Sequence, residues 1–145
     1  MPTIRTYTEV LARNIRSARA AAGLQQEPVA VRMRKLGFTA WLRQTVANVE
    51  KGRRGLRAEE IIGLALALET TVPQLLEPLA QDEWVQLPSG ESLAPGAYID
   101  LIRGRIPSDI SWYNDNFAKS GRSAAALAFE ATWPDEAKPP KDGTE

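Results

Sequence analysis

The chain of 145 residues contains no cysteine and no histidine. Without cysteine it has no disulfide bond, no thiolate zinc site and no cysteine nucleophile, and without histidine it lacks the commonest general base and metal ligand. Its longest apolar run, residues 64–68, is about a quarter of the length that a membrane span needs. The first residues are polar and include no apolar segment of the kind found in signal peptides. These absences predict a cytoplasmic protein with no membrane association, no metal site and no cofactor.

Catalysis is not expected either. Without thiol and imidazole groups it would rest on carboxylates, and those of Asp109 and Asp115 show neither paired spacing nor the signature of a pocket. The sequence therefore predicts a binding protein rather than an enzyme.

Charge is distributed unevenly, although eighteen basic residues balance eighteen acidic ones. Residues 1–57 hold twelve Lys or Arg and three Glu, a net charge of +9, and residues 58–145 carry −9. This asymmetry is typical of a basic region that binds an anionic partner, followed by an acidic region that neutralises it or binds another protein. The alternative is a basic helix surface that is merely solvated.

Five short segments between Val10 and Leu79 have apolar residues at helical spacing and end at turn residues. The expected helices cover about 8–22, 26–36, a third stretch that begins between Thr39 and Gln44 and ends before Gly52, then 58–68, and a short segment capped by Thr71. The side chains expected to face the core are Leu11, Ile15, Ala18 and Ala22, then Val29, Ala30, Met33 and Leu36, then Leu42, Val46 and Val49, then Ile61, Leu64, Ala65 and Leu68, and finally Leu75, Leu76 and Leu79. The fold class is mainly α, with a compact five-helix domain over residues 1–79.

The pattern changes after Pro78. Residues 84–87 alternate like a strand, 88–90 form a turn, and 95–103 read as a short helix closed by Gly104. Residues 80–133 are thus expected to be a small α+β or irregular region, with another helix at 123–132, and residues 134–145 have the composition of a disordered tail. The apolar residues of 84–133 either mediate dimerisation or signal reception, or they pack a small appended core.

The second and third segments have the arrangement of a helix-turn-helix, in which a short helix is followed by a turn and by a second helix with one polar face. Over about Leu11 to Leu76 the sequence resembles the Xre, or lambda repressor and Cro-like, helix-turn-helix family. The residues that carry the resemblance are Arg19, Gly23-Leu24, Gln26, Val29-Ala30, Thr45-Val46, Val49-Glu50-Lys51-Gly52-Arg53, and Val72-Pro73-Gln74-Leu75-Leu76. The resemblance implies a five-helix lambda repressor-like domain whose third helix enters the DNA major groove.

Residue roles follow from this resemblance. It implies a structural salt bridge between Arg19 and Glu50, and a contact of Gln26 with the first residue of the third helix and with a DNA phosphate. Since Val46 and Val49 point inward, the base-reading face would consist of Arg43, Gln44, Ala47 and Asn48. The residues expected to bind DNA phosphates are Gln26, Thr45, Lys51, Arg53, Arg54 and Arg57. Arg13 and Arg16 either extend this track or belong to a solvated face.

One departure from the family pattern is a longer connection before the third helix, residues 37–42, similar to that of some actinobacterial regulators. It contains Phe38 and Trp41, which either pack in the core or stack on sugars or bases.

The function predicted from these features is a sequence-specific transcriptional regulator, a nucleoid-associated homodimeric repressor that binds double-stranded DNA. The alternative is an antitoxin-like or adaptor protein whose acidic region, residues 80–133, binds a partner protein.

Overall fold

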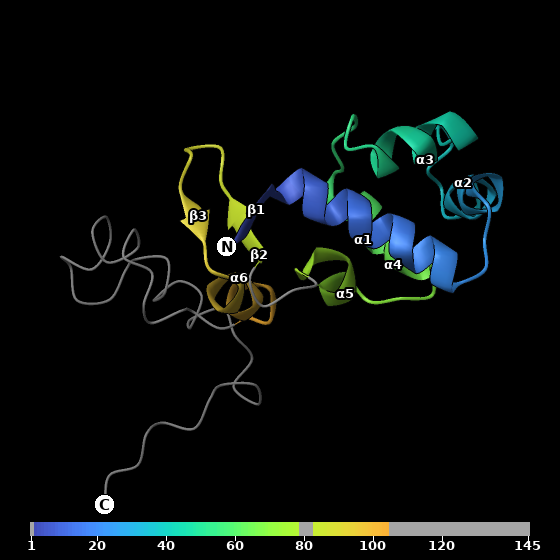
Figure 1. The fold of residues 1–145 in the computed structure, drawn as a ribbon. Coiled ribbons are helices and arrows are strands. Elements are labelled where there is room, and N and C mark those ends of the chain that lie inside the picture. Colours follow the sequence, from blue (N-terminus) through green and yellow to red (C-terminus); the bar gives the residue numbers. More distant parts are fainter. Residues whose placement is uncertain (1, 79–82, 105–145) are drawn as a thin grey trace, which may run out of the picture. The chain divides into compact units, whose positions relative to one another are not determined.

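Six helices and three short strands make up residues 2–78 and 83–104, which are the residues that the computed structural model describes (Figure 1). In chain order they are β1 (Thr3–Thr6), α1 (Tyr7–Ala21), α2 (Gln26–Lys35), α3 (Arg43–Glu50), α4 (Ala58–Ala67), α5 (Val72–Leu76), β2 (Glu83–Gln86), β3 (Ser92–Leu93) and α6 (Pro95–Ile102). They belong to one unit, Met1–Arg105. The predicted fold class, a mainly helical helix-turn-helix domain followed by a small α+β part, is confirmed.

Helices α1 to α5 begin and end close to the predicted positions because their terminal residues suit those positions. Thr6 caps α1 in a capping box, in which its Oγ1 accepts a 3.2 Å hydrogen bond from the Glu9 N–H and its own N–H donates to Glu9 Oε2 at 2.7 Å. The turns after α1 and α3 place Gly23 and Gly52 at φ +68°, a backbone conformation that side chains with a β-carbon resist.

The main core lies among α1 to α5 and consists largely of the predicted apolar residues. Its buried members are Leu11, Ile15, Val29, Ala30, Met33, Trp41, Val46, Val49, Ile61, Leu64, Ala65, Ala67, Leu68 and Leu75. Two predictions are wrong: Leu36 is 45% exposed at the C-cap of α2, and Leu42 is 59% exposed at the N-cap of α3. Trp41 is buried next to Leu42 and Phe38 packs against the core, so of the two alternatives for these residues the structure shows packing in the core.

A three-stranded sheet joins the N-terminus to residues 83–93. Strand β1 pairs in parallel with β2, with Ile4 opposite Trp84, and β2 pairs with β3 in antiparallel fashion. The strand at 84–87 and the helix at 95–103 were predicted, but β1 was not. Its four residues carry no readable alternation, and they become a strand because β2 supplies hydrogen-bonding partners about eighty residues later in the chain.

A second, smaller core packs the sheet against α1 and α6. Val10, Val85 and Tyr98 are its buried members, with Leu93 and Ile102 packed against them. Arg13 of α1 forms an ion pair with the buried carboxylate of Glu83, which also binds Arg5 Nε at 2.7 Å. For Val85 and Tyr98 the structure therefore shows the second alternative, a small packed core.

Some predictions lie outside the described residues. These are the burial of Leu79, residues 80–82 and 105–133 of the predicted 80–133 region, including its helix at 123–132, and the tail at 134–145. In the described part of the chain no helix is long and apolar enough to span a membrane.

Candidate nucleic-acid interface

Helix α3 is fixed to the rest of the domain by one apolar side. Val46 and Val49 are buried in the main core, and α3 contacts both α2 and α1. Figure 1 shows α3 at the outer side of α1, with α2 beside it. The opposite side of α3 therefore faces away from the core.

A hydrogen-bonded network of charged and polar groups holds the C-terminal end of α3. Arg19 of α1 forms an ion pair with Glu50, in which Nη2 donates to Oε2 at 3.2 Å, and Arg19 Nη1 donates to the Leu24 carbonyl at 2.9 Å. The hydrogen bond to Glu50 raises the pKa of the Arg19 guanidinium. This is the ion pair that the family resemblance implies, and it joins α1 to the last residue of α3.

Gln26 belongs to the same network. Its Nε2 donates to Glu50 Oε2 at 2.9 Å, so its amide lies at the C-terminal end of α3. The hydrogen bond of Gln26 is thus with the last residue of α3, and the expected contact with the first residue of the helix stays a prediction. Glu50, already oriented by Arg19, offers Gln26 a charged acceptor at the N-terminus of α2.

The side chains predicted to read bases share the outward side of α3. Arg43 and Gln44 are exposed, and Ala47 and Asn48 are half-buried. Gln44 Nε2 donates to Asn48 Oδ1 at 3.1 Å, one helical turn apart, which leaves the Gln44 carbonyl oxygen and the Asn48 NH₂ group for other partners. Thr45 has a structural contact as well, because its Oγ1 accepts a 3.1 Å hydrogen bond from the Leu42 N–H.

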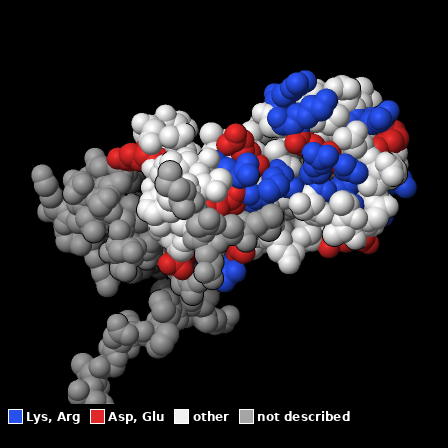
Figure 2. Space-filling model, viewed as in Figure 1, with Lys and Arg blue, Asp and Glu red and all other residues white. Residues whose placement is uncertain are grey.

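The basic residues after α3 divide into two groups. Lys51 and Arg53 are exposed and form no ion pair with any described residue. Arg54 binds Glu60 through Nη2 to Oε1 at 2.8 Å and lies over the Trp41 ring, 5.1 Å from its centroid. Arg57 contacts Glu59 Oε1 at 3.4 Å and remains largely exposed. Figure 2 shows Lys and Arg side chains gathered over this helical end of the chain, with acidic groups between them.

Glu60 is a buried carboxylate that the sequence analysis did not single out. It accepts hydrogen bonds from Arg54, from the Trp41 indole at 3.3 Å and from the Arg57 backbone N–H at 2.9 Å. The Arg54 hydrogen bond, with those of Arg57 and Trp41, lowers the pKa of Glu60 from 4.5 to about 2 against the opposing effect of burial. The one sequence feature that could have revealed Glu60 is its position in α4, directly before Ile61 and on the buried face of the helix.

Arg16 adds a further cation beside the outward side of α3. A pocket of about 160 Å³ is lined by Arg16, Lys51 and Ala47 together with the Arg19, Gln26 and Glu50 network. Since Arg19 and Glu50 neutralise each other, Arg16 and Lys51 give this pocket its positive charge. Among residues 2–78 and 83–104 no group of three or more acidic side chains is placed to hold a metal ion.

Two solved structures are similar to part of the chain. A hypothetical transcription factor, NHTF, from Neisseria is 32% identical over 50% of this chain and 77% of its own, with a TM-score of 0.44. The restriction-modification controller protein C.AhdI from Aeromonas hydrophila is 29% identical over 47% of this chain and 94% of its own, with a TM-score of 0.41. The chain matches no protein-family model, and the curated proteins gave no match.

Proposed function

We propose that the chain is a sequence-specific DNA-binding transcriptional regulator that inserts α3 into the major groove. The observation that carries the proposal is the two-sided character of α3. Val46 and Val49 anchor one side in the core, while Arg43 and Gln44 are exposed on the other. A helix of this kind fits the major groove of B-form DNA with its polar side against the base edges.

The chemistry of the outward side suits base recognition. Arg43 has the planar fork that binds guanine O6 and N7. Gln44 and Asn48 are linked by one hydrogen bond, and their remaining carbonyl and NH₂ groups match the N6 donor and N7 acceptor of adenine. Ala47, between them on the same side, is small enough to meet a thymine methyl group.

Phosphate binding is assigned first to exposed cations that form no ion pair with any residue of 2–78 or 83–104. Lys51 and Arg53 in the loop after α3 and Arg16 on α1 are exposed, and Arg16 and Lys51 line one pocket with Ala47 of α3. Thr45 and Arg57 also remain candidates. Arg54 is a weaker one, because its guanidinium is held by Glu60 and Trp41. Gln26 is limited in the same way by its hydrogen bond to Glu50.

We further propose that the protein acts as a homodimeric repressor. One α3 of eight residues contacts only a few base pairs, and specific affinity generally requires a second half-site. A dimer would place two copies of α3 in successive major grooves of an inverted repeat. Sedimentation analysis of the free protein and of its complex with DNA tests this part: a complex with one chain per duplex site contradicts it.

The test of DNA recognition compares two double variants in a footprinting experiment on genomic fragments. Arg43→Ala with Gln44→Ala is expected to remove the preference for particular sequences while non-specific binding persists. Lys51→Ala with Arg53→Ala is expected to weaken binding to all sequences and to reduce the slope of affinity against salt by about two.

Both pairs remove exposed side chains, so each serves as the folding control for the other. Circular dichroism and thermal melting of the two variants should match the parent protein. Identical footprints from the parent and from the Arg43→Ala, Gln44→Ala variant would refute α3 as the reading element. If neither variant nor the parent binds DNA, the proposed function itself is wrong.

A further inference from the structure

A pocket of about 640 Å³, whose lining includes no residue of α3, lies where the start of α1 meets the β2–β3 turn and α6. Its walls include Tyr7 and Thr8 from α1, Leu87 and Pro88 from the turn, and Tyr98 from α6. The volume falls in the range of about 300–1,000 Å³ that is usual for small-molecule sites. Nothing in the DNA-binding proposal uses this pocket.

The pocket wall carries no charged side chain. A charged ligand would lose its hydration here without gaining an ion pair, which is costly. An uncharged ligand avoids this cost. Tyr7, Tyr98, Leu87 and Pro88 give the wall much of its apolar surface, which favours an aromatic or otherwise apolar body.

Tyr98 supplies one of the polar groups of the site, beside Thr6, Thr8 and Gln86. It is 8% exposed, and its hydroxyl forms no hydrogen bond with any residue in the described part of the chain. Burial raises the pKa of Tyr98, as does the neighbouring Tyr7, so the hydroxyl stays protonated and able to donate. The hydroxyl is not among the fully buried polar atoms of the described residues, so solvent reaches it and it can donate to a ligand that brings a hydrogen-bond acceptor.

We propose that this pocket binds an uncharged small molecule with an aromatic or apolar body and a carbonyl-type oxygen that accepts a hydrogen bond from Tyr98. The ligand would lie against Tyr7 and Pro88. This inference goes beyond the proposed function and does not depend on it, because the pocket and α3 are formed by different residues.

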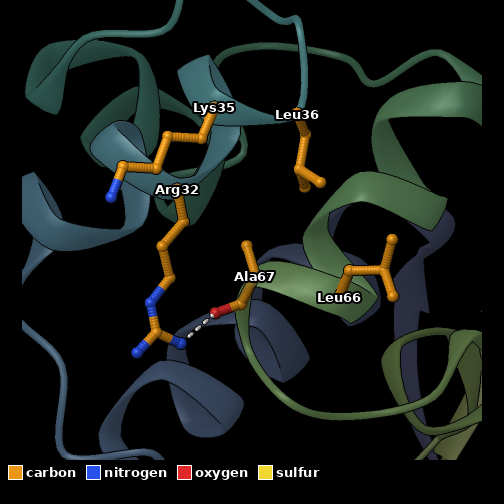
Figure 3. Close-up of a pocket in the computed structure, with 5 residues that line it drawn as sticks. All are labelled: Arg32, Lys35, Leu36, Leu66 and Ala67. Atoms are coloured by element: carbon orange, nitrogen blue, oxygen red, sulfur yellow. Dashed lines mark hydrogen bonds between the residues drawn. The ribbon is translucent and has the colours of Figure 1, made fainter.

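The contrast with a second pocket supports the assignment of ligand charge. That pocket, about 230 Å³ between α2 and α4, is lined by Leu36, Leu66 and Ala67 but also by Arg32 and Lys35 (Figure 3). Arg32 Nη1 donates to the Ala67 carbonyl at 2.8 Å. The two pockets are both partly apolar but differ in charge, so the second provides a matched control for unspecific binding to apolar surface.

The test uses the full chain and Nile red, an uncharged aromatic probe with a carbonyl oxygen whose fluorescence increases in apolar surroundings. We expect saturable binding with one probe per chain. Tyr98→Phe, which removes only the hydroxyl, should weaken binding about threefold to tenfold. Tyr7→Ala should weaken it about fivefold. Leu66→Ser, in the second pocket, should leave the affinity unchanged.

A competition experiment tests the charge requirement directly. Coumarin should displace Nile red, whereas coumarin-3-carboxylate, which adds a negative charge to the same ring system, should do so at least tenfold less well. Absence of saturable Nile red binding would overturn the proposal. Equal affinities of the parent, Tyr98→Phe and Tyr7→Ala, or a loss of binding in Leu66→Ser, would overturn it as well. Tyr7 is partly exposed, so Tyr7→Ala keeps the test decisive should Tyr98→Phe fail to fold.

Discussion

Arg54 and Glu60 form an ion pair in which the carboxylate is buried and the guanidinium lies at the protein surface, with Nη2 and Oε1 2.8 Å apart. The pair connects the loop after α3 to the first turn of α4. Trp41 completes the arrangement, since its indole N–H donates to the same carboxylate and its ring lies under the guanidinium. The long connection before α3 is thereby tied to the loop that follows α3.

Loss of Arg54 should destabilise the domain. Arg54→Ala leaves the buried Glu60 carboxylate with only the more distant guanidinium of Arg57, whose Nη2 lies 3.8 Å from Oε1, and we expect the free energy of unfolding to fall by about 2–3 kcal/mol. Arg53→Ala, which removes the neighbouring exposed cation, should change it by no more than about 0.5 kcal/mol. Urea denaturation followed by circular dichroism measures both. Equal effects of the two substitutions would mean that the Arg54–Glu60 pair adds nothing to stability.

Acid should weaken the same contact. The pKa of Glu60 is about 2 in the folded protein against 4.5 for the free side chain, so its contribution is complete above about pH 5 and is lost as the pH falls toward 2. The contribution amounts to at most about 3 kcal/mol. Urea midpoints measured from pH 7 to pH 2 should therefore fall less steeply for Glu60→Gln than for the parent. Parallel acid profiles would show that Glu60 is not the group responsible.

The helices could be predicted from the sequence because their information is local. Helical spacing of apolar residues, the glycines at positions 23 and 52 and the cap at Thr71 all lie within or next to the elements they define. The outward side of α3 could also be predicted, because the burial of Val46 and Val49 determines which residues of the helix face away from the core.

The missed features depend on contacts between distant residues. Strand β1 exists because it pairs with β2, and the burial of Glu83 depends on Arg5 and Arg13. Leu42 fitted the helical spacing of α3, but the chain enters the helix one residue later and Trp41 fills the core instead. Likewise, no local signal distinguishes Arg54, which binds Glu60, from Arg53, which does not.

The space beside two helical glycines predicts opposite effects of adding a methyl group. A β-carbon at Gly63 would lie 2.5 Å from Cε2 of Phe38, so Gly63→Ala should destabilise the domain by about 1–3 kcal/mol. At Gly96 of α6 a β-carbon would meet nothing within 4 Å, and Gly96→Ala should be neutral or stabilise by up to about 1 kcal/mol. Thermal melting of the two variants measures the difference. A stabilising Gly63→Ala would show that Phe38 does not pack tightly against α4.

The Arg19–Glu50 ion pair should stabilise the domain and hold α3 in place at the same time. Arg19→Met leaves a buried carboxylate with only Gln26, and Glu50→Met leaves a mostly buried guanidinium with only the Leu24 carbonyl, so each should cost about 2–3 kcal/mol. The double variant removes both charges and should cost at least about 1 kcal/mol less than the sum. A double-mutant cycle from urea denaturation gives this coupling energy, and a value near zero would mean that the pair adds nothing to stability.

Gln26→Ala is the matched control, because it removes one hydrogen bond to Glu50 and no charge, and it should cost about 1 kcal/mol. If α3 is held mainly by Val46 and Val49, the Gln26 and Arg19 variants will have similarly small effects, and the ion pair will not be what fixes the C-terminal end of the helix.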